Sequence, residues 1–291
     1  MPKSKRFKAQ STKLKSHSAK PKRSLGQNFL VDGNIAARIV SALGPCAEET
    51  IVEIGPGRGA LTEPLLEQAG RVVAVELDRH LAPQLRAKFV LYDNFTVFEA
   101  DALQVDFAEL IAPVTQARVV ANLPYNISTA ILQRLLAQRN CLTELILMLQ
   151  FEVVERITAP PGHHERGYLS VLVEAYAEAE ALFDVPPQSF RPVPKVMSSV
   201  ARLRPREHEA LAGCDELFFR HLVSAGFAQK RKTIGNNLKA APEAMQNALE
   251  TGGNVMLALT RADIDPQRRA ETITLAEWVR LAKGEAALIS H

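Results

Sequence analysis

No part of this chain is apolar over a length that could cross a membrane. Its longest apolar runs, such as residues 145–149, fall far short of the roughly 20 residues that a membrane-spanning helix needs. The N-terminal segment also lacks the apolar core of a secretory signal. We therefore expect a cytoplasmic protein with no membrane partner.

Cysteine is scarce as well. The three cysteines, Cys46, Cys141 and Cys214, lie far apart in the chain. An odd number without a close pair argues against a disulfide framework and against a zinc site, and it is typical of a reducing compartment. The adjacent His163 and His164 lie in a Pro/Gly-rich loop without a carboxylate pattern, so we expect no metal.

The first 31 residues contain no acidic residue. They hold nine Lys or Arg, which leaves 26 of the 35 basic residues and all 32 acidic residues for the rest of the chain. A basic arm of this kind, which we place at residues 1–22, most often binds polyanions, because each phosphate contact releases counterions. A solvated flexible tail and a transit peptide are the alternatives that this composition leaves open.

Beyond the arm the composition is that of a folded protein. The 291 residues are 47% hydrophobic and 23% charged, which excludes wholesale disorder. Apolar runs at 51–54, 71–77, 95–99, 118–121 and 145–150 predict strands, and helical patterns at 35–43, 60–68 and 81–89 alternate with them. This alternation predicts an α/β domain over residues 23–204, with a Rossmann-like parallel sheet and helices on both faces.

The pattern changes after residue 204. Helices are expected at 216–227, 244–250 and 275–283, with no convincing strand between them. Thr274 and Glu277 form a capping box for the last helix, and Trp278 has the spacing of a core residue. We expect a small all-helical domain over residues 205–291.

A glycine-rich turn, Gly55-Pro56-Gly57-Arg58-Gly59, follows the first predicted strand and opens a helix. Glu76 follows 21 residues after Gly55, where a carboxylate can bind the hydroxyls of a ribose. Asp101, after the third strand, could bind an adenine amine or cap the next helix. The layout suits either NAD or S-adenosylmethionine.

The tetrapeptide Asn122-Leu123-Pro124-Tyr125 ends the fourth predicted strand, where open α/β sheets bind ligands. A plain turn built on Pro124 would explain these residues without any chemical role. The chemical explanation is a receptor for a base amine: the Asn122 side-chain oxygen and a carbonyl near Leu123 accept its two hydrogens, Pro124 stiffens the loop, and Tyr125 stacks on the base. Such a base must first leave its stack, at a cost of a few kcal/mol.

Taken in chain order, these motifs resemble the ribosomal RNA adenine dimethyltransferase family over roughly residues 23–283. The resemblance rests on 26–30, the glycine turn, 76–78, Asp101, 122–128, 166–171, 185–190, 194–196 and 230–234. It implies S-adenosylmethionine as cofactor, bound by Asn28, Leu30, Gly55, Glu76, Asp101 and Asn122. It also implies that Phe190 faces Tyr125 across a flipped adenine.

The resemblance also implies a substrate. The family acts on two adjacent adenines in a hairpin loop near the 3′ end of small-subunit ribosomal RNA, and each adenine receives two methyl groups during ribosome assembly. We therefore expect an enzyme that binds the immature small subunit, and we expect it to be a monomer. For RNA contact we expect Lys195, Arg202, Arg204, Lys230, Arg231 and Lys232. Arg206 would lie on the same strand face as Arg202 and Arg204. Solvation of the protein surface would by itself explain any one of these basic side chains.

The sequence departs from the family at several places. Val193 interrupts the run of three prolines that often precedes the lysine. Met197 stands where an acidic residue is usual, and Ala228 and Gly235 stand where Asn and Arg are expected. These departures concern RNA contact rather than methyl transfer. The alternatives are a relative acting on large-subunit RNA, a DNA adenine methyltransferase, a binding protein on the same fold such as an assembly or transcription factor, and an NAD-dependent enzyme.

Overall fold

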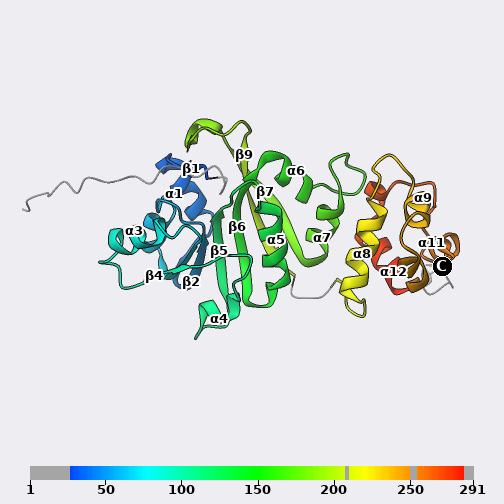
Figure 1. The fold of residues 1–291 in the computed structure, drawn as a ribbon, viewed down its shortest axis with the longest axis horizontal. Coiled ribbons are helices and arrows are strands. Elements are labelled where there is room, and N and C mark those ends of the chain that lie inside the picture. The colour runs from blue at the N-terminus through cyan, green and yellow to red at the C-terminus, as the bar shows by residue number, and fades with distance from the viewer. Residues whose placement is uncertain (1–26, 207–209, 250–253, 285–291) are drawn as a thin grey trace, which may run out of the picture.

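The computed structural model describes residues 27–206, 210–249 and 254–284, so the predicted arm at 1–22 lies outside the described residues. An α/β domain lies beside a smaller domain of helices (Figure 1). Within the described ranges no helix combines the length and the apolar character that a membrane span requires.

The α/β domain is built on a seven-stranded sheet with the order β4-β3-β2-β5-β6-β9-β7. Its strands are β2 (Cys46–Ile54), β3 (Ala69–Glu76), β4 (Phe95–Glu99), β5 (Ala117–Asn122), β6 (Leu142–Gln150), β7 (Ala177–Val185) and β9 (Ser198–Pro205). The five predicted strands are all present and pair in parallel. The structure therefore confirms the Rossmann-like sheet.

β7 and β9 were not among the five predicted strands, although the alternating arginines indicated a strand at the position of β9. These two strands make the far edge of the sheet antiparallel. β9 pairs antiparallel with both β6 and β7, so the expectation of a wholly parallel sheet is wrong there. β7 begins with alternating alanine and glutamate, residues that favour helices. Pairing with β9 overrides that local preference.

A second, two-stranded sheet joins two distant segments. β1 (Phe29–Leu30) pairs antiparallel with β8 (Phe190–Arg191). This pairing holds the start of the described chain against the loop that precedes β9.

Helices cover both faces of the main sheet. They are α1 (Gly33–Ser41), α2 (Thr62–Leu66), α3 (Leu81–Lys88), α4 (Phe107–Ile111), α5 (Ser128–Ala137), α6 (Phe151–Ile157) and α7 (Tyr168–Tyr176), with short 3₁₀ turns η2 (Arg139–Cys141) and η3 (Pro187–Ser189). Because strand side chains alternate between faces, Val120 packs with α1–α3 while Val119 and Ala121 pack with α4–α7. α1 begins before its predicted start because the Asp32 side chain accepts hydrogen bonds from the next turn.

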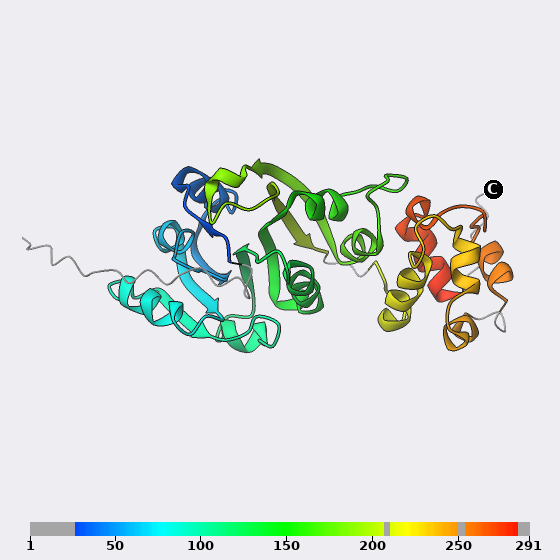
Figure 2. The ribbon, with the colours of Figure 1, turned by 45° about the horizontal axis from the view of Figure 1, so that its top comes forward.

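After β9 the described elements are helical. They are α8 (Glu216–Gly226), α9 (Ile234–Lys239), α10 (Glu243–Ala248), α11 (Val255–Arg261), η4 (Ala270–Thr272) and α12 (Leu275–Lys283). The capping box of Thr274 and Glu277 is present, and Trp278 is fully buried, as predicted. Figure 2 shows this helical domain at the end of the α/β domain that carries α7. The apolar core beneath α7 continues into it.

Candidate active site

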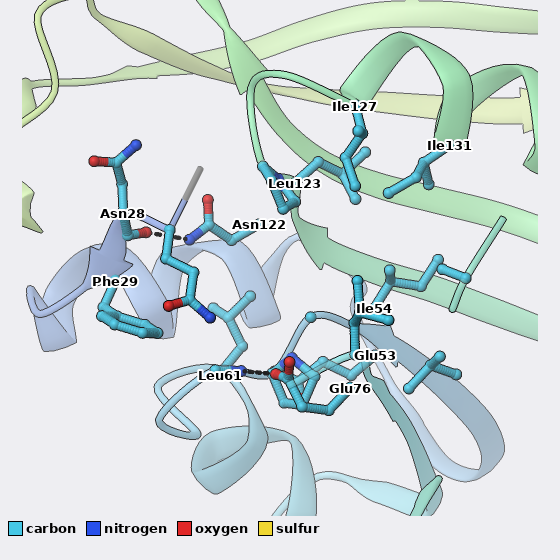
Figure 3. A pocket seen from close by; sticks show the side chains of 18 of the residues that line it. Asn28, Phe29, Glu53, Ile54, Leu61, Glu76, Asn122, Leu123, Ile127 and Ile131 are labelled. Carbon is cyan, nitrogen blue, oxygen red and sulfur yellow. Dashed lines mark hydrogen bonds between the residues drawn. The ribbon is translucent and has the colours of Figure 1, made fainter. Parts of the chain in front are cut away.

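The carboxyl ends of β2, β3, β4 and β5 meet at one edge of the sheet, and a cavity of about 260 Å³ opens there. The predicted residues Asn28, Leu30, Gly55, Glu76, Asp101, Asn122, Leu123, Pro124 and Tyr125 all line this cavity. Figure 3 shows several of them converging from different strands. The structure thus brings together nearly all of the residues that the sequence placed at the site.

The glycine turn after β2 has a backbone that only glycine adopts readily. Gly55, Gly57 and Gly59 have φ values of 67°, 59° and 81°. A Cβ on Gly57 would also lie 3.0 Å from the Phe29 ring. The turn therefore presents bare backbone to the cavity, as a ligand that approaches the main chain requires.

Glu76, the last residue of β3, is held in place by backbone donors. Its Oε2 accepts a hydrogen bond from Gly57 N at 3.0 Å, and its Oε1 accepts one from Asp78 N at 2.8 Å. The carboxyl group is buried, and this burial raises its pKa although the two backbone hydrogen bonds oppose the shift. Each oxygen keeps a further lone pair, so the group can accept from a ligand hydroxyl.

A second buried carboxyl group, Glu53 of β2, also lines the cavity, and the sequence analysis did not single it out. Its Oε2 accepts a hydrogen bond from the Thr62 hydroxyl at 2.6 Å. Burial raises the pKa of Glu53 to about 8, and the nearby Glu76 adds to the shift. Glu53 therefore holds its proton at neutral pH.

Asn122, at the end of β5, has a fixed amide orientation. Its Nδ2 donates a hydrogen bond to the backbone oxygen of Asn28 at 3.2 Å (Figure 3). A carbonyl oxygen can only accept, so the NH₂ end of the amide must face Asn28. The Asn122 Oδ1 is thereby left as the acceptor.

Hydrogen bonds also fix Leu123 and Tyr125, which follow in the same loop. Leu123 N donates to Met148 O at 3.2 Å, and the Leu123 side chain is buried. The Tyr125 hydroxyl shares a hydrogen bond of 2.6 Å with the hydroxyl of Ser198, the first residue of β9. The Tyr125 side chain lines the cavity. Burial raises the pKa of Tyr125, so its hydroxyl stays neutral at neutral pH. Ser198 gave no sequence signal, because nothing in the sequence places the start of β9 beside Tyr125.

The segment around β1 crosses the cavity and is held at both sides. Gln27 Nε2 donates to the Asp78 carboxylate at 3.4 Å, while Asn28 accepts from Asn122 on the other side. The guanidinium carbon of Arg58 lies 4.6 Å from the centre of the Phe29 ring. These contacts join the N-terminal segment to the glycine turn and to the ends of β3 and β5.

Asp101, after β4, does not cap a helix. One of its carboxylate oxygens accepts from Leu103 N at 2.9 Å, which makes a local turn, and α4 begins later with Asp106 as its cap. The helix-cap alternative is therefore wrong. The position of Asp101 on the cavity wall fits the role of a ligand acceptor.

Phe190 differs from its expected placement. Its side chain is fully buried in the apolar core that contains Leu30 and Val200, and it does not line the cavity. In this conformation a base in the cavity cannot stack on the Phe190 ring. The pairing of β1 with β8 accounts for its burial.

The predicted RNA-binding residues fall into two groups. Lys195 and the turn between α8 and α9 that carries Lys230, Arg231 and Lys232, called the basic turn below, are exposed. Arg202 and Arg204 instead form ion pairs with Glu144 and Glu180, and Arg206 pairs with Glu178.

Arg202, Arg204 and Arg206 also lie away from the strand ends that form the cavity. β9 runs antiparallel to β6, so Arg202 lies opposite Ile146 while Ser198 lies opposite Gln150, at the edge that carries the site. The pairing therefore places these arginines away from the cavity. Their contact with RNA stays a prediction.

The histidine pair shows no metal-site arrangement. The rings of His163 and His164 lie 4.5 Å apart, and His164 Nε2 lies 3.3 Å from a carboxylate oxygen of Glu165. Within the part of the chain that the structure describes, no three His, Cys, Asp or Glu side chains gather closely enough to hold a metal ion.

Known proteins resemble this chain over nearly its whole length. The family model for ribosomal RNA adenine dimethylase matches residues 18–282. Ribosomal RNA small subunit methyltransferase A of Hahella chejuensis is 45% identical, over 88% of this chain and 90% of the relative. A dimethyladenosine transferase from Plasmodium falciparum superposes with a TM-score of 0.75 at 26% identity, over 87% of this chain and 95% of that structure.

The 23S rRNA methyltransferase ErmE superposes with a TM-score of 0.65, also at 26% identity, over 88% of this chain and 99% of that structure. Together with the family match, these likenesses settle the classification. The chain belongs to the ribosomal RNA adenine dimethylase family of S-adenosylmethionine-dependent methyltransferases.

Proposed function

We propose that this enzyme transfers methyl groups from S-adenosylmethionine to the N6 amines of two adjacent adenosines in a hairpin loop near the 3′ end of small-subunit ribosomal RNA. Both adenosines become dimethyladenosines, and the substrate is the immature small subunit in the cytoplasm. The observation that carries this proposal is the anchored amide of Asn122, whose Nδ2 is engaged by Asn28 while Oδ1 remains to accept from an amine.

The cavity has the donors and acceptors that the cofactor needs. Glu76 would accept from the ribose hydroxyls and Asp101 from the adenine amine, while the glycine turn allows the methionine part close to the backbone. Asn28 and Leu30 would cover the cofactor from the N-terminal segment. The bound cofactor supplies a methyl group on a cationic sulfur, which is electrophilic without further activation.

Asn122 and its neighbours act on the adenine. An exocyclic amine is a poor nucleophile because its lone pair is delocalised into the ring. The Asn122 Oδ1 and the carbonyl of Leu123 would accept the two amine hydrogens, which favours a pyramidal nitrogen with a localised lone pair. Tyr125, fixed by Ser198, offers a stacking face, and correct alignment supplies much of the rate.

No strong base is needed for the proton that the nitrogen releases. Once alkylated, the nitrogen is cationic and its proton is acidic enough to be lost to water. Glu53 is not required as a base: it is protonated at neutral pH and accepts a hydrogen bond from the Thr62 hydroxyl.

The relatives support the small-subunit substrate over the large-subunit one. The relative named for the small subunit is 45% identical, whereas ErmE, named for 23S rRNA, is 26% identical. A binding protein without catalysis is less well supported, because Glu76, Asp101 and Asn122 are all in place on the cavity wall. The family match leaves no support for an NAD-dependent enzyme.

For RNA binding we propose Lys195 and the basic turn, which are exposed and carry side chains suited to phosphate contact. Arg202 and Arg204 would have to leave ion pairs with Glu144 and Glu180, so we give them a lesser part. We propose that the enzyme works as a monomer and without a metal ion.

The test is to incubate the enzyme with methyl-labelled S-adenosylmethionine and small subunits from cells that lack this modification, and then to map the label by nuclease digestion and mass spectrometry. Dimethyladenosine at two adjacent positions near the 3′ end of the small-subunit RNA is expected. Label at other positions of the small-subunit RNA, or no label in that RNA, would refute the proposal.

A further inference from the structure

A polar cluster built around the buried Tyr176 joins the two domains. The hydroxyl of Tyr176, at the end of α7, donates to Glu216 Oε2 at 3.0 Å and accepts from Arg220 Nε at 3.1 Å. The other carboxylate oxygen of Glu216 accepts from Arg139 Nη2 at 2.8 Å. Tyr176 and Arg139 belong to the α/β domain, whereas Glu216 and Arg220 lie on α8 of the helical domain.

The ring of Tyr176 adds to the same cluster. The guanidinium carbons of Arg139 and Arg220 lie 4.5 and 5.2 Å from the ring centre. The side chain is only 2% exposed, and burial raises the pKa of its phenol, so the hydroxyl remains a donor at neutral pH. One tyrosine thus contacts charged groups from both domains.

These contacts are directional, unlike the apolar packing around them. α7 also packs on α8 and α12 through a continuous apolar core, and apolar contact tolerates a range of angles between helices. The hydrogen bonds of Glu216 require a particular alignment of donor and acceptor. The cluster therefore selects one orientation of α8 against the α/β domain.

α8 transmits that orientation to the basic turn. Glu216 lies in its first turn, and its 11 residues extend the helix over about 16 Å. Beyond its last residue, Asn237 Nδ2 donates to Gly226 O at 2.6 Å and to Gln229 O at 3.1 Å. Asn237 thereby fastens the start of the basic turn to the end of α8.

We propose that Tyr176, with Arg139, Glu216 and Arg220, is a positioning cluster that sets where the basic turn lies relative to Asn122. RNA bound at the basic turn then presents its target adenine at the cavity. This inference rests on the proposed function for its consequence, whereas the placement of α8 can be tested without it. Tyr176 is a positioning residue, since it lies outside the catalytic cavity.

The test uses Tyr176→Phe, which removes the hydroxyl and keeps the ring and the apolar contacts. Spin labels at Glu99→Cys and Ala228→Cys, two exposed positions, report the distance from the sheet edge to the basic turn in a Cys214→Ser background. Tyr92→Phe, a change at an exposed tyrosine, is the matched control. Glu216→Gln, which keeps the shape of the side chain, is the second variant.

We expect both variants to broaden or shift the distance distribution and to raise KM for immature subunits by about tenfold, the effect of losing one hydrogen bond to a charged group. The kcat at saturating RNA and the affinity for S-adenosylhomocysteine should stay unchanged, as should every property of Tyr92→Phe. A global packing defect would change the cofactor affinity too.

An unchanged distance distribution in both variants would overturn the positioning of α8. A changed distribution with an unchanged KM would overturn its link to RNA. If the unmodified enzyme methylates no RNA, the proposed function fails, and the distance measurement alone still decides whether the cluster positions the basic turn.

Discussion

The backbone oxygen of Asn28 lies 3.2 Å from Nδ2 of Asn122 and accepts its hydrogen bond. Asn28 and Asn122 both line the cavity, and we propose Asn122 as the acceptor for the substrate amine. In the proposed mechanism, one contact therefore connects the segment that would cover the cofactor to the group that would receive the adenine. The remaining oxygen of the Asn122 amide has a defined direction even before substrate binds.

Glu76→Gln should weaken binding of S-adenosylhomocysteine by about 10- to 100-fold, the range for losing hydrogen bonds to a charged acceptor. Glutamine would also turn an NH₂ group towards a backbone donor, either Gly57 N or Asp78 N. Titration calorimetry measures the affinity. Glu99→Gln, at the exposed end of the neighbouring strand, is the control, and equal affinities in the two variants would exclude Glu76 as a ligand.

Glu53 should make the enzyme less stable as pH rises. Its pKa is about 8 in the folded protein and near 4.5 in the unfolded chain. Between these values the unfolded state has lost the proton and the folded state keeps it, so the free energy of unfolding falls by up to about 1.4 kcal/mol per pH unit.

Glu53→Gln removes this dependence and retains an acceptor for Thr62. Urea unfolding between pH 5 and 8 should show the variant gaining stability relative to the unmodified enzyme as pH rises. Glu67→Gln, at an exposed glutamate, should leave the pH dependence as it is. Parallel pH profiles for the unmodified enzyme and Glu53→Gln would show that Glu53 is ionised in the folded state.

Gly226→Ala should destabilise the helical domain. A Cβ there would lie 2.3 Å from the Trp278 ring and 2.9 Å from Ile234, and overpacking of a core costs about 1–3 kcal/mol. Trp278 is the single tryptophan of the chain, so its fluorescence during urea unfolding reports on this domain.

The same variant should bind S-adenosylhomocysteine normally, because the cofactor cavity is made by the α/β domain. Ser224→Ala, on the exposed side of α8, is the control and should unfold like the unmodified enzyme. A midpoint unchanged by Gly226→Ala would mean that the helical core is looser than the structure shows.

The basic turn should contribute to the salt dependence of RNA binding. Replacing Lys230, Arg231 and Lys232 by alanine removes three phosphate contacts, which should lower the slope of log affinity against log salt by about 2 to 3. Filter binding of immature subunits at several salt concentrations measures the slope. Lys239→Ala, exposed on α9, should change it little; an unchanged slope in the triple variant would remove the basic turn from the interface.

The sequence predicted the parallel part of the fold because strands β2 to β6 are rich in Val, Ile and Leu and alternate with helical patterns. It missed β7, whose alanines and glutamates favour a helix. The alternating arginines indicated a strand at β9, but only the pairing with β6 reveals its antiparallel direction. Because that direction was unknown, the alternation of Arg202 and Arg204 indicated a shared face but not which end of the strands they lie near.

The cavity residues were predictable because the ends of parallel strands meet at one edge. The burial of Phe190 and the contact between Asn28 and Asn122 were not, since both depend on the pairing of β1 with β8, two segments far apart in the chain. Glu53 was missed because a glutamate inside an apolar strand pattern is not marked by spacing as a cavity residue.

The central claim is that the Asn122 amide receives the amine of the target adenine. The most direct measurement is the single-turnover rate of methyl transfer to immature small subunits by Asn122→Ala, with saturating cofactor whose binding is verified by calorimetry. The rate should fall by at least about a hundredfold, the scale for losing one hydrogen-bonding group that acts in the transition state, while cofactor affinity stays largely intact. A rate within a few fold of the unmodified enzyme would contradict the account.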